Sequence, residues 1–262
     1  MNPFNLTKPI SHPHISFPRG LGAAKLAAQD PVVLPPEFRK AKEPEVVFPP
    51  DDTPKNAHRE ILIEPKFLDH AICDEYVQYA KQQPEVDLSV FDSEATNKQG
   101  KIAWRIDKGT RDTQFVDIEP IRGAVIDLMR HAVQQYLNPF FNVQIKDSEE
   151  PQFLIYHEGG HYRPHIDAEA LWNDGSGKLQ WVRNVDRDIS LILYFNDDFE
   201  GGEIVFPKQA ISIRPKKGML VAFPSTHHYL HGVNPVVKGT RYAMVNWFSL
   251  GIHGVHESVR NP

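Results

Sequence analysis

Apolar positions follow a helical period in the first half of the chain. One amphipathic stripe covers residues 67–83 and ends before Pro84, where a proline cannot continue a helix. A second stripe covers residues 118–137, and Asn138-Pro139 predicts its end. Each predicted helix has a single apolar face, so we expect both to pack against a sheet.

Beyond residue 140 the apolar runs become short and are separated by turn residues. Glycine pairs such as Gly159-Gly160 and Gly201-Gly202 mark two of these turns. Many short strands with such spacing are typical of a sandwich or barrel. The candidate strands lie at residues 153–157, 189–196, 203–206, 211–214, 219–223 and 241–249.

The N-terminal part has a different composition from the rest. Residues 1–58 are rich in proline, which is incompatible with long helices and central strands. We therefore divide the chain into an irregular arm, residues 1–58, and a folded domain, residues 59–262. The short apolar run at 61–63 predicts the first strand of that domain.

Charge and cysteine content narrow the class of protein. A net charge of -5 argues against a nucleic-acid binder. The single cysteine, Cys73, excludes an intrachain disulfide. No apolar run is long enough to span a bilayer, and the start lacks the pattern of a signal peptide. We expect a cytoplasmic protein without a membrane partner; the oligomeric state stays open.

Three residues suggest a metal centre. His165 and Asp167 are two positions apart, so in an extended strand both side chains point to one face. His231 supplies a third ligand from a distant part of the chain, with His227 and His228 as competitors. Two histidines and one carboxylate with open positions are typical of non-haem Fe(II) oxygenases. Arg241 follows and could bind a carboxylate through two hydrogen bonds.

The ordered set of motifs resembles the 2-oxoglutarate and Fe(II)-dependent dioxygenases of the prolyl 4-hydroxylase type. Its elements are Tyr156-x-x-Gly159, Tyr162-x-x-His165-x-Asp167, Ile192-Leu193-Tyr194-Phe195-Asn196, Gly201-Gly202-Glu203, Pro215-x-x-Gly218, and His231 to Arg241 followed by Trp247. The similarity covers roughly residues 60–250. It implies a mainly β fold, a double-stranded β-helix or distorted jelly roll buttressed by helices.

The resemblance also implies the roles of individual residues. His165, Asp167 and His231 would bind Fe(II), and Arg241 would bind the distal carboxylate of 2-oxoglutarate. Contacts to this cosubstrate are expected from Tyr156, Tyr194 and Ser190. The Fe(II), 2-oxoglutarate and O2 would support hydroxylation of an unactivated C–H with decarboxylation of 2-oxoglutarate to succinate. Ascorbate is an additional candidate reductant.

The sequence indicates the type of reaction more closely than the identity of the substrate. An amino acid, a peptidyl residue or another small molecule is compatible with the resemblance. The insertion at residues 168–188 directly follows two proposed ligands, which predicts a lid or a substrate wall, with a surface hairpin as the alternative. Candidates for binding an anionic substrate group are Arg105, Arg163 and Arg183.

Two other function classes compete with the oxygenase. A Zn(II) hydrolase also uses three protein ligands and a water, but it needs a general base and has no use for Arg241. A non-catalytic binding module could keep the fold, but it would be expected to lose a ligand, and this chain keeps all three.

Overall fold

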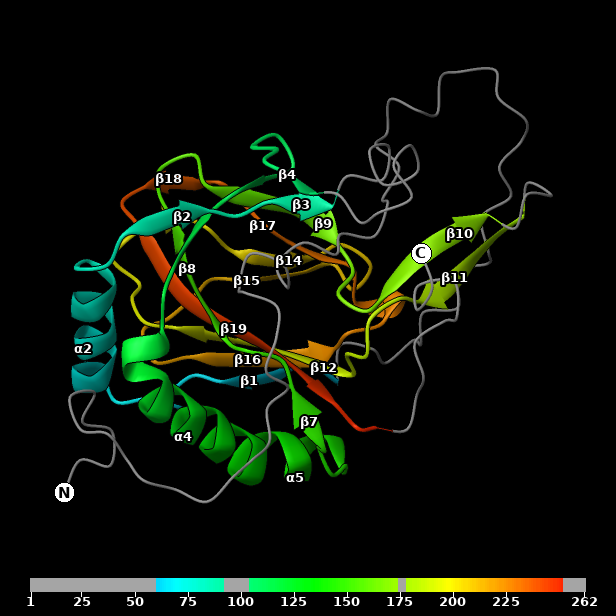
Figure 1. Ribbon diagram of the computed structural model, residues 1–262, viewed down its shortest axis with the longest axis horizontal. Helices are drawn as coiled ribbons and strands as arrows, with labels where there is room; N and C mark the ends of the chain where they lie inside the picture. Colours follow the sequence, from blue (N-terminus) through cyan, green and yellow to red (C-terminus); the bar gives the residue numbers. More distant parts are fainter. Residues whose placement is uncertain (1–59, 92–103, 174–177, 252–262) are drawn as a thin grey trace.

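The described part of the chain forms two sheets that face each other. The computed structural model describes residues 60–91, 104–173 and 178–251. Figure 1 shows the strands stacked in layers with the helices along one side. The predicted arm, residues 1–58, lies outside the described residues. The β-rich prediction is confirmed.

The larger sheet has eight strands and carries the helices. Its order is β1-β16-β12-β19-β8-β6-β2, and β7 pairs with β19. The strands are β1 Leu62–Glu64, β2 Glu85–Asp87, β6 Gln114–Val116, β7 Asp147–Ser148, β8 Gln152–Tyr156, β12 Ile189–Tyr194, β16 Leu220–Pro224 and β19 Arg241–Ser249.

The smaller sheet closes the other side of the barrel. Its five strands are, in order, β15 Ile211–Ile213, β14 Ile204–Phe206, β17 His231–Val233, β9 His161–His165 and β5 Arg111–Asp112. Buried aromatic side chains fill the space between the sheets. Phe206 of the smaller sheet meets Phe223 of the larger one with ring centroids 4.9 Å apart. This arrangement is the predicted double-stranded β-helix.

Three strand pairs lie outside these two sheets. They are β3 Val90–Phe91 with β4 Trp104–Arg105, β10 Glu169–Asn173 with β11 Leu179–Arg183, and β13 Glu200–Gly201 with β18 Val236–Lys238. The second pair is the insertion between the ligand Asp167 and β12. It folds as an antiparallel hairpin in which Glu169 faces Arg183, and Figure 1 shows it projecting from one end of the barrel.

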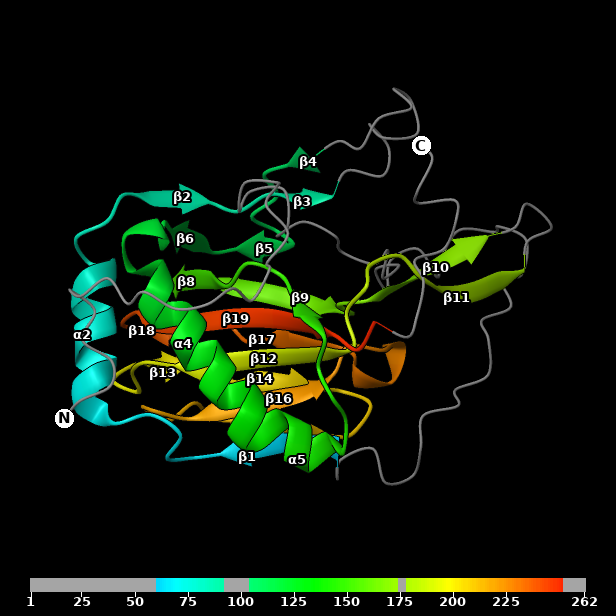
Figure 2. The same cartoon turned by 60° about the horizontal axis from the view of Figure 1, so that its bottom comes forward.

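The helices cover the outer face of the larger sheet, as Figure 2 shows. They are α2 His70–Ala80, η3 Glu119–Ile121, α4 Arg122–Ala132, the π-helical turn η4 Val133–Leu137 and α5 Asn138–Phe141; a further 3-10 turn, η5, spans His227–Tyr229. None of the helices in the described ranges has the length and apolar content to cross a membrane.

The predicted end of the second helix was wrong. The helical path does not stop at Asn138-Pro139 but continues to Phe141, and Asn142 ends it with a φ of 52°. Pro139 lies in the first turn of α5, after the π-helical turn. Backbone N–H groups in a first turn need no helical acceptor, so a proline is tolerated there.

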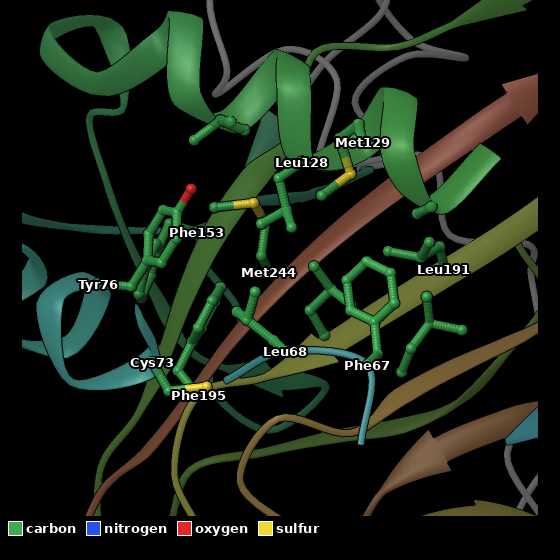
Figure 3. Packing of buried hydrophobic residues seen from close by; sticks show 14 of the residues in the cluster. Phe67, Leu68, Cys73, Tyr76, Leu128, Met129, Phe153, Leu191, Phe195 and Met244 are labelled. Atoms are coloured by element: carbon green, nitrogen blue, oxygen red, sulfur yellow. The ribbon is translucent and has the colours of Figure 1, made fainter. Parts of the chain in front are cut away.

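A single apolar core joins the helices to the larger sheet. Figure 3 shows Tyr76 from α2 and Leu128 from α4 above side chains of the sheet. The Phe195 ring lies 4.8 Å from that of Tyr76 and 5.0 Å from that of Phe153, measured between centroids. Both predicted apolar stripes therefore have the packing role that their period indicated.

Cys73 is buried in this core and should be unreactive. It is 0% exposed, and burial raises the pKa of its thiol from 9.0 to about 12. We expect a thiol reagent at pH 8 to label the unfolded chain but not the native protein, because the thiolate is the reactive form. The same shift should cost stability as pH rises from about 9 towards 12. Rapid labelling of the native protein would contradict this burial.

Candidate active site

The three predicted ligands meet between the two sheets. His165 ends β9 and His231 begins β17, and the two residues are directly paired across these antiparallel strands. Asp167 lies two residues beyond the end of β9, so the expected strand stops before it. One ligand atom from each residue lies within 4.8 Å of the others. The chain brings together the full predicted set.

Hydrogen bonds orient both histidines in the same way. The Nδ1–H of His165 donates to the Arg163 carbonyl at 2.9 Å, and that of His231 donates to the Tyr229 carbonyl at 3.0 Å. These bonds fix the tautomer and leave each Nε2 as a lone-pair donor. The two Nε2 atoms lie 3.5 and 3.6 Å from the Asp167 carboxylate oxygens, beyond an ordinary hydrogen bond but close enough to share one ion.

The protonation states also suit a metal. Burial alone would raise the pKa of the Asp167 carboxyl, but His231 and His165 beside it hold that pKa far below its usual range. Burial and the neighbouring His165 lower the pKa of His231 to about 4. At neutral pH, Asp167 is therefore an anion and His231 is neutral, which are the forms that bind metal. The donor set fits Fe(II).

Ser190 lines the pocket beside a predicted ligand, and its contact with the cosubstrate stays a prediction. Its hydroxyl donates to Asp167 Oδ2 at 2.6 Å and also bonds the Ser225 hydroxyl at 2.8 Å. The side chain is buried in β12. A hydroxyl that donates to this carboxylate restricts its orientation, as the hydrogen-bond partners of metal ligands commonly do.

Removal of this hydroxyl should weaken metal binding without removing a ligand. We expect Ser190→Ala to lower the affinity of the protein for Co(II) by about 10–100-fold, the usual effect of losing a partner of a ligand. The measurement is a titration followed by the absorption of bound Co(II). Ser212→Ala, at an exposed position of β15, is the control. Equal affinities for both variants would remove Ser190 from this role.

Arg241 lines the same pocket and lies between two tyrosines. It is only 1% exposed. Its guanidinium carbon lies 4.6 Å from the ring centroid of Tyr156 and 5.0 Å from that of Tyr194. Within the described residues, its Nε and Nη1 atoms have no hydrogen-bond partner, and the guanidinium lies close enough to the Tyr194 hydroxyl to interact with it. Burial raises the pKa of Tyr194, so this hydroxyl stays a neutral donor.

Unpaired donors of this kind fit an anion. A buried cation without a partner is costly, and a planar guanidinium binds a carboxylate through parallel hydrogen bonds. Arg241 and Tyr156 both line one pocket, which is also lined by all three predicted ligands. The residues present therefore fit the dicarboxylate that the sequence predicted, with one end at Arg241 and the other towards the metal.

Sequence reasoning missed two buried arginines that line this pocket. Arg111 of β5 lies over the Tyr162 ring at 4.5 Å, and Tyr162 stacks on the metal ligand His165 with centroids 3.6 Å apart. Arg187 donates to both carboxylate oxygens of Glu149, at 2.5 and 2.7 Å, and lies 4.0 Å above the Trp247 ring. Its Nη1 also donates to the Asp167 carbonyl at 3.2 Å.

The arginines that were proposed for an anionic substrate lie elsewhere. Arg183 pairs with Asp186 at 2.9 Å and Asp188 at 3.0 Å, and Arg105 pairs with Asp107 at 2.8 Å. Arg163 is exposed, and none of the three lines the pocket. The sequence alone does not show which arginine side chains are buried, because burial depends on how the strands pair.

Three other histidines that the structure describes lie outside the cluster. His157 bonds Glu85 at 2.7 Å, and His161 bonds the Gly159 carbonyl at 2.9 Å. The competitor His227 bonds Glu169 at 2.6 Å. The choice of His231 among the three histidines of its segment agrees with the position of the ligand cluster.

Sequence comparisons place this region in a known superfamily. Residues 151–249 match the family model described as the 2OG-Fe(II) oxygenase superfamily. Prolyl 3-hydroxylase 2 of Homo sapiens is 46% identical over 69 residues, which are 24% of this chain and 10% of that protein. A PKHD-type hydroxylase of Aliarcobacter butzleri is 31% identical over 140 residues, which are 51% of this chain and 58% of the relative. The chain thus spans a small part of the first relative and over half of the second.

Solved structures share the fold. A viral collagen prolyl hydroxylase from Paramecium Bursaria Chlorella virus-1 superimposes with a TM-score of 0.50 at 21% identity, covering 72% of this chain and 95% of that one. A prolyl hydroxylase from Trichoplax adhaerens gives a TM-score of 0.50 at 17% identity, covering 73% and 84%. At these identities the likeness supports the double-stranded β-helix. The match over residues 151–249 and the cluster of three possible metal ligands together support a 2OG-Fe(II) oxygenase, and the similar proteins include prolyl and PKHD-type hydroxylases.

Proposed function

We propose that this protein is a 2-oxoglutarate-dependent hydroxylase that acts on a C–H bond of an amino acid, a peptidyl residue or another small molecule. One observation carries the proposal. The three-residue ligand cluster and the buried Arg241 with unpaired donors share a single pocket. A pocket with a metal at one place and a cation at another suits a cosubstrate that has a carboxylate at its far end.

Each residue of the pocket then has a defined task. Bound Fe(II) and 2-oxoglutarate would supply the oxidising chemistry, in which decarboxylation to succinate is coupled to C–H hydroxylation. Arg241 binds and orients the distal carboxylate, with the hydroxyl of Tyr194 as a neutral donor beside it. Ser190 holds Asp167 in place. Trp247, under the Arg187 guanidinium, forms a wall that excludes water from the reacting carbon.

The hydrolase alternative lacks an essential group. A zinc hydrolase needs a general base near the metal-bound water. Among the described residues that line the pocket, the only carboxylate and the only imidazoles are the three ligands themselves. The buried Arg241 would have no task in hydrolysis.

The test is cosubstrate turnover under controlled oxygen. The protein is purified without O2, loaded with Fe(II) and 2-oxoglutarate, and then exposed to O2 while succinate is measured. We expect slow succinate formation without substrate, and none from His165→Ala. His157→Ala, at a half-exposed histidine outside the cluster, should behave as the wild type. An absence of succinate together with stoichiometric zinc would support the hydrolase.

A further inference from the structure

The short turn η5 is a junction of four distant segments. Just beyond it, the ligand His231 donates through Nδ1 to the Tyr229 carbonyl at 3.0 Å. The Tyr229 hydroxyl donates to Glu60, at the start of the described chain. Gln209 donates to the His228 carbonyl at 2.8 Å. The position of a metal ligand is therefore set by a turn that other parts of the molecule hold from several sides.

The strongest of these contacts comes from the hairpin. One carboxylate oxygen of Glu169, Oε2, accepts both the backbone N–H and the ring Nδ1–H of His227, each at 2.6 Å. Short bonds to an ionised acceptor are about twice as strong as neutral ones. We name this pair the Glu169 clamp.

The clamp joins the two halves of the metal site. Glu169 is two residues beyond Asp167, and His227 is four residues before His231. The two partners are 58 positions apart in the sequence. A backbone bond from Ala168 N–H to the Ser225 carbonyl, at 3.0 Å, lies beside the clamp. The segment that carries the carboxylate ligand and the segment that carries the second histidine are thus fastened to each other directly outside the cluster.

The second strand of the hairpin also rests on this turn. The Trp181 ring of β11 stacks on the His227 ring, with centroids 4.9 Å apart and an interplanar angle of 8°. At the end of the hairpin, Arg183 pairs with Asp188, whose Oδ2 accepts the Leu250 N–H at 2.7 Å. Both strands of the hairpin are therefore fixed at their base. With its base held in this way, the hairpin fits the role of a rigid substrate wall better than that of a hinged lid.

We propose that Glu169 is a positioning residue, which clamps the hairpin β10–β11 to the turn η5 and thereby fixes His231 relative to Asp167. This inference rests on the three-ligand metal centre of the proposed function. Its consequence is a coupling between the hairpin and the metal. A substrate or partner that moves the base of the hairpin moves a metal ligand, and a bound metal in turn stiffens the hairpin.

The test uses the metal alone, without cosubstrate or O2. The full chain is freed of metal, and Co(II) binding is followed through the absorption spectrum of the bound ion, which reports ligand geometry. Hydrogen exchange of the metal-free protein is measured over residues 168–173 and 225–231. Three variants are compared: Glu169→Ala, Glu169→Gln, which loses the charge but keeps the shape, and His227→Phe, which keeps a ring against Trp181. Glu200→Ala, at an exposed position of β13, is the control.

We expect Co(II) affinity to fall about tenfold or more in Glu169→Ala and His227→Phe, with an altered spectrum. Exchange should become faster in both segments, and Glu200→Ala should match the wild type. Wild-type affinity in these variants, or faster exchange in the hairpin alone, would overturn the inference. If Glu169→Ala does not fold, the Co(II) affinity and hydrogen exchange of His227→Phe and Glu169→Gln decide whether Glu169 positions His231. A wild-type chain that binds no Co(II) would instead refute the metal centre, and the role of Glu169 with it.

Discussion

Replacement of Arg241 by leucine is expected to raise the 2-oxoglutarate concentration for half-maximal succinate formation by about thirtyfold or more. Truncating one partner of a buried, hydrogen-bonded charge pair costs about 2–5 kcal/mol, and each 1.4 kcal/mol is about a factor of ten. Arg241→Lys should be affected less, because it keeps the charge but loses the planar pair of donors. The measurement is initial succinate formation as a function of 2-oxoglutarate concentration.

We expect Arg241→Leu to fold as the wild type does. A loss of cosubstrate binding can then be distinguished from a loss of stability. In the absence of an anion, the wild-type guanidinium is a buried charge, so its removal should not lower the melting temperature of the protein without cosubstrate. Arg163→Leu, at an exposed arginine of β9, is the matched control. An unchanged 2-oxoglutarate dependence in Arg241→Leu would show that the cosubstrate binds elsewhere.

Replacement of His231 by alanine is expected to abolish measurable metal binding at micromolar protein, and turnover with it. Loss of a ligand removes a metal bond and should cost more than the about 10–100-fold that loss of a ligand's partner costs. His231 is buried, with Phe206 and Phe223 beside it at ring centroid distances of 5.9 and 4.6 Å. The measurement is a Co(II) or Fe(II) titration of the metal-free protein.

His157→Ala provides the comparison for this loss as well, because its ring bonds Glu85 outside the cluster. Added imidazole offers a stricter check. The cavity left by His231→Ala is next to the metal position, so imidazole should restore part of the Co(II) affinity there but not in Asp167→Ala. Full metal affinity in His231→Ala would mean that another residue completes the site, and the assignment of the third ligand would be wrong.

The sequence predicted the fold well where the spacing of apolar residues matches the face that each element packs into the core. Both helices and the strands β8, β12 and β19 were expected from apolar spacing, which left a sandwich or a barrel open. The resemblance to the dioxygenase family selected the double-stranded β-helix. The end of the second helix was missed, because a π-helical turn before Pro139 lets the helical path continue. The hairpin after Asp167 was only one of the alternatives considered. Its register depends on Trp181 stacking against a turn far away in the sequence.

The residues of the site could be predicted where they belong to short motifs or follow one another at a characteristic spacing. His165, Asp167, His231 and Arg241 met as expected, since pairing of β9 with β17 and of β8 with β19 brings them together. The partners of the ligands were not predictable. Ser190 was predicted as a cosubstrate contact, and its hydrogen bond to Asp167 was not foreseen. Arg187 and Glu149 form a buried pair 38 residues apart, for which no sequence period gives a signal.

Strand β19 sets a limit on how this pocket can be redesigned. Along its nine residues, Arg241, Val245 and Trp247 line the pocket while Tyr242, Met244 and Phe248 face the helical core. At about 3.3 Å per residue, Arg241 and Trp247 are held roughly 20 Å apart. A single inserted residue would exchange the two faces and bring core methyl and aromatic groups to the pocket. The distance along β19 between Arg241 and Trp247 can therefore change only in steps of two residues. The width of the pocket can be changed by substituting single side chains.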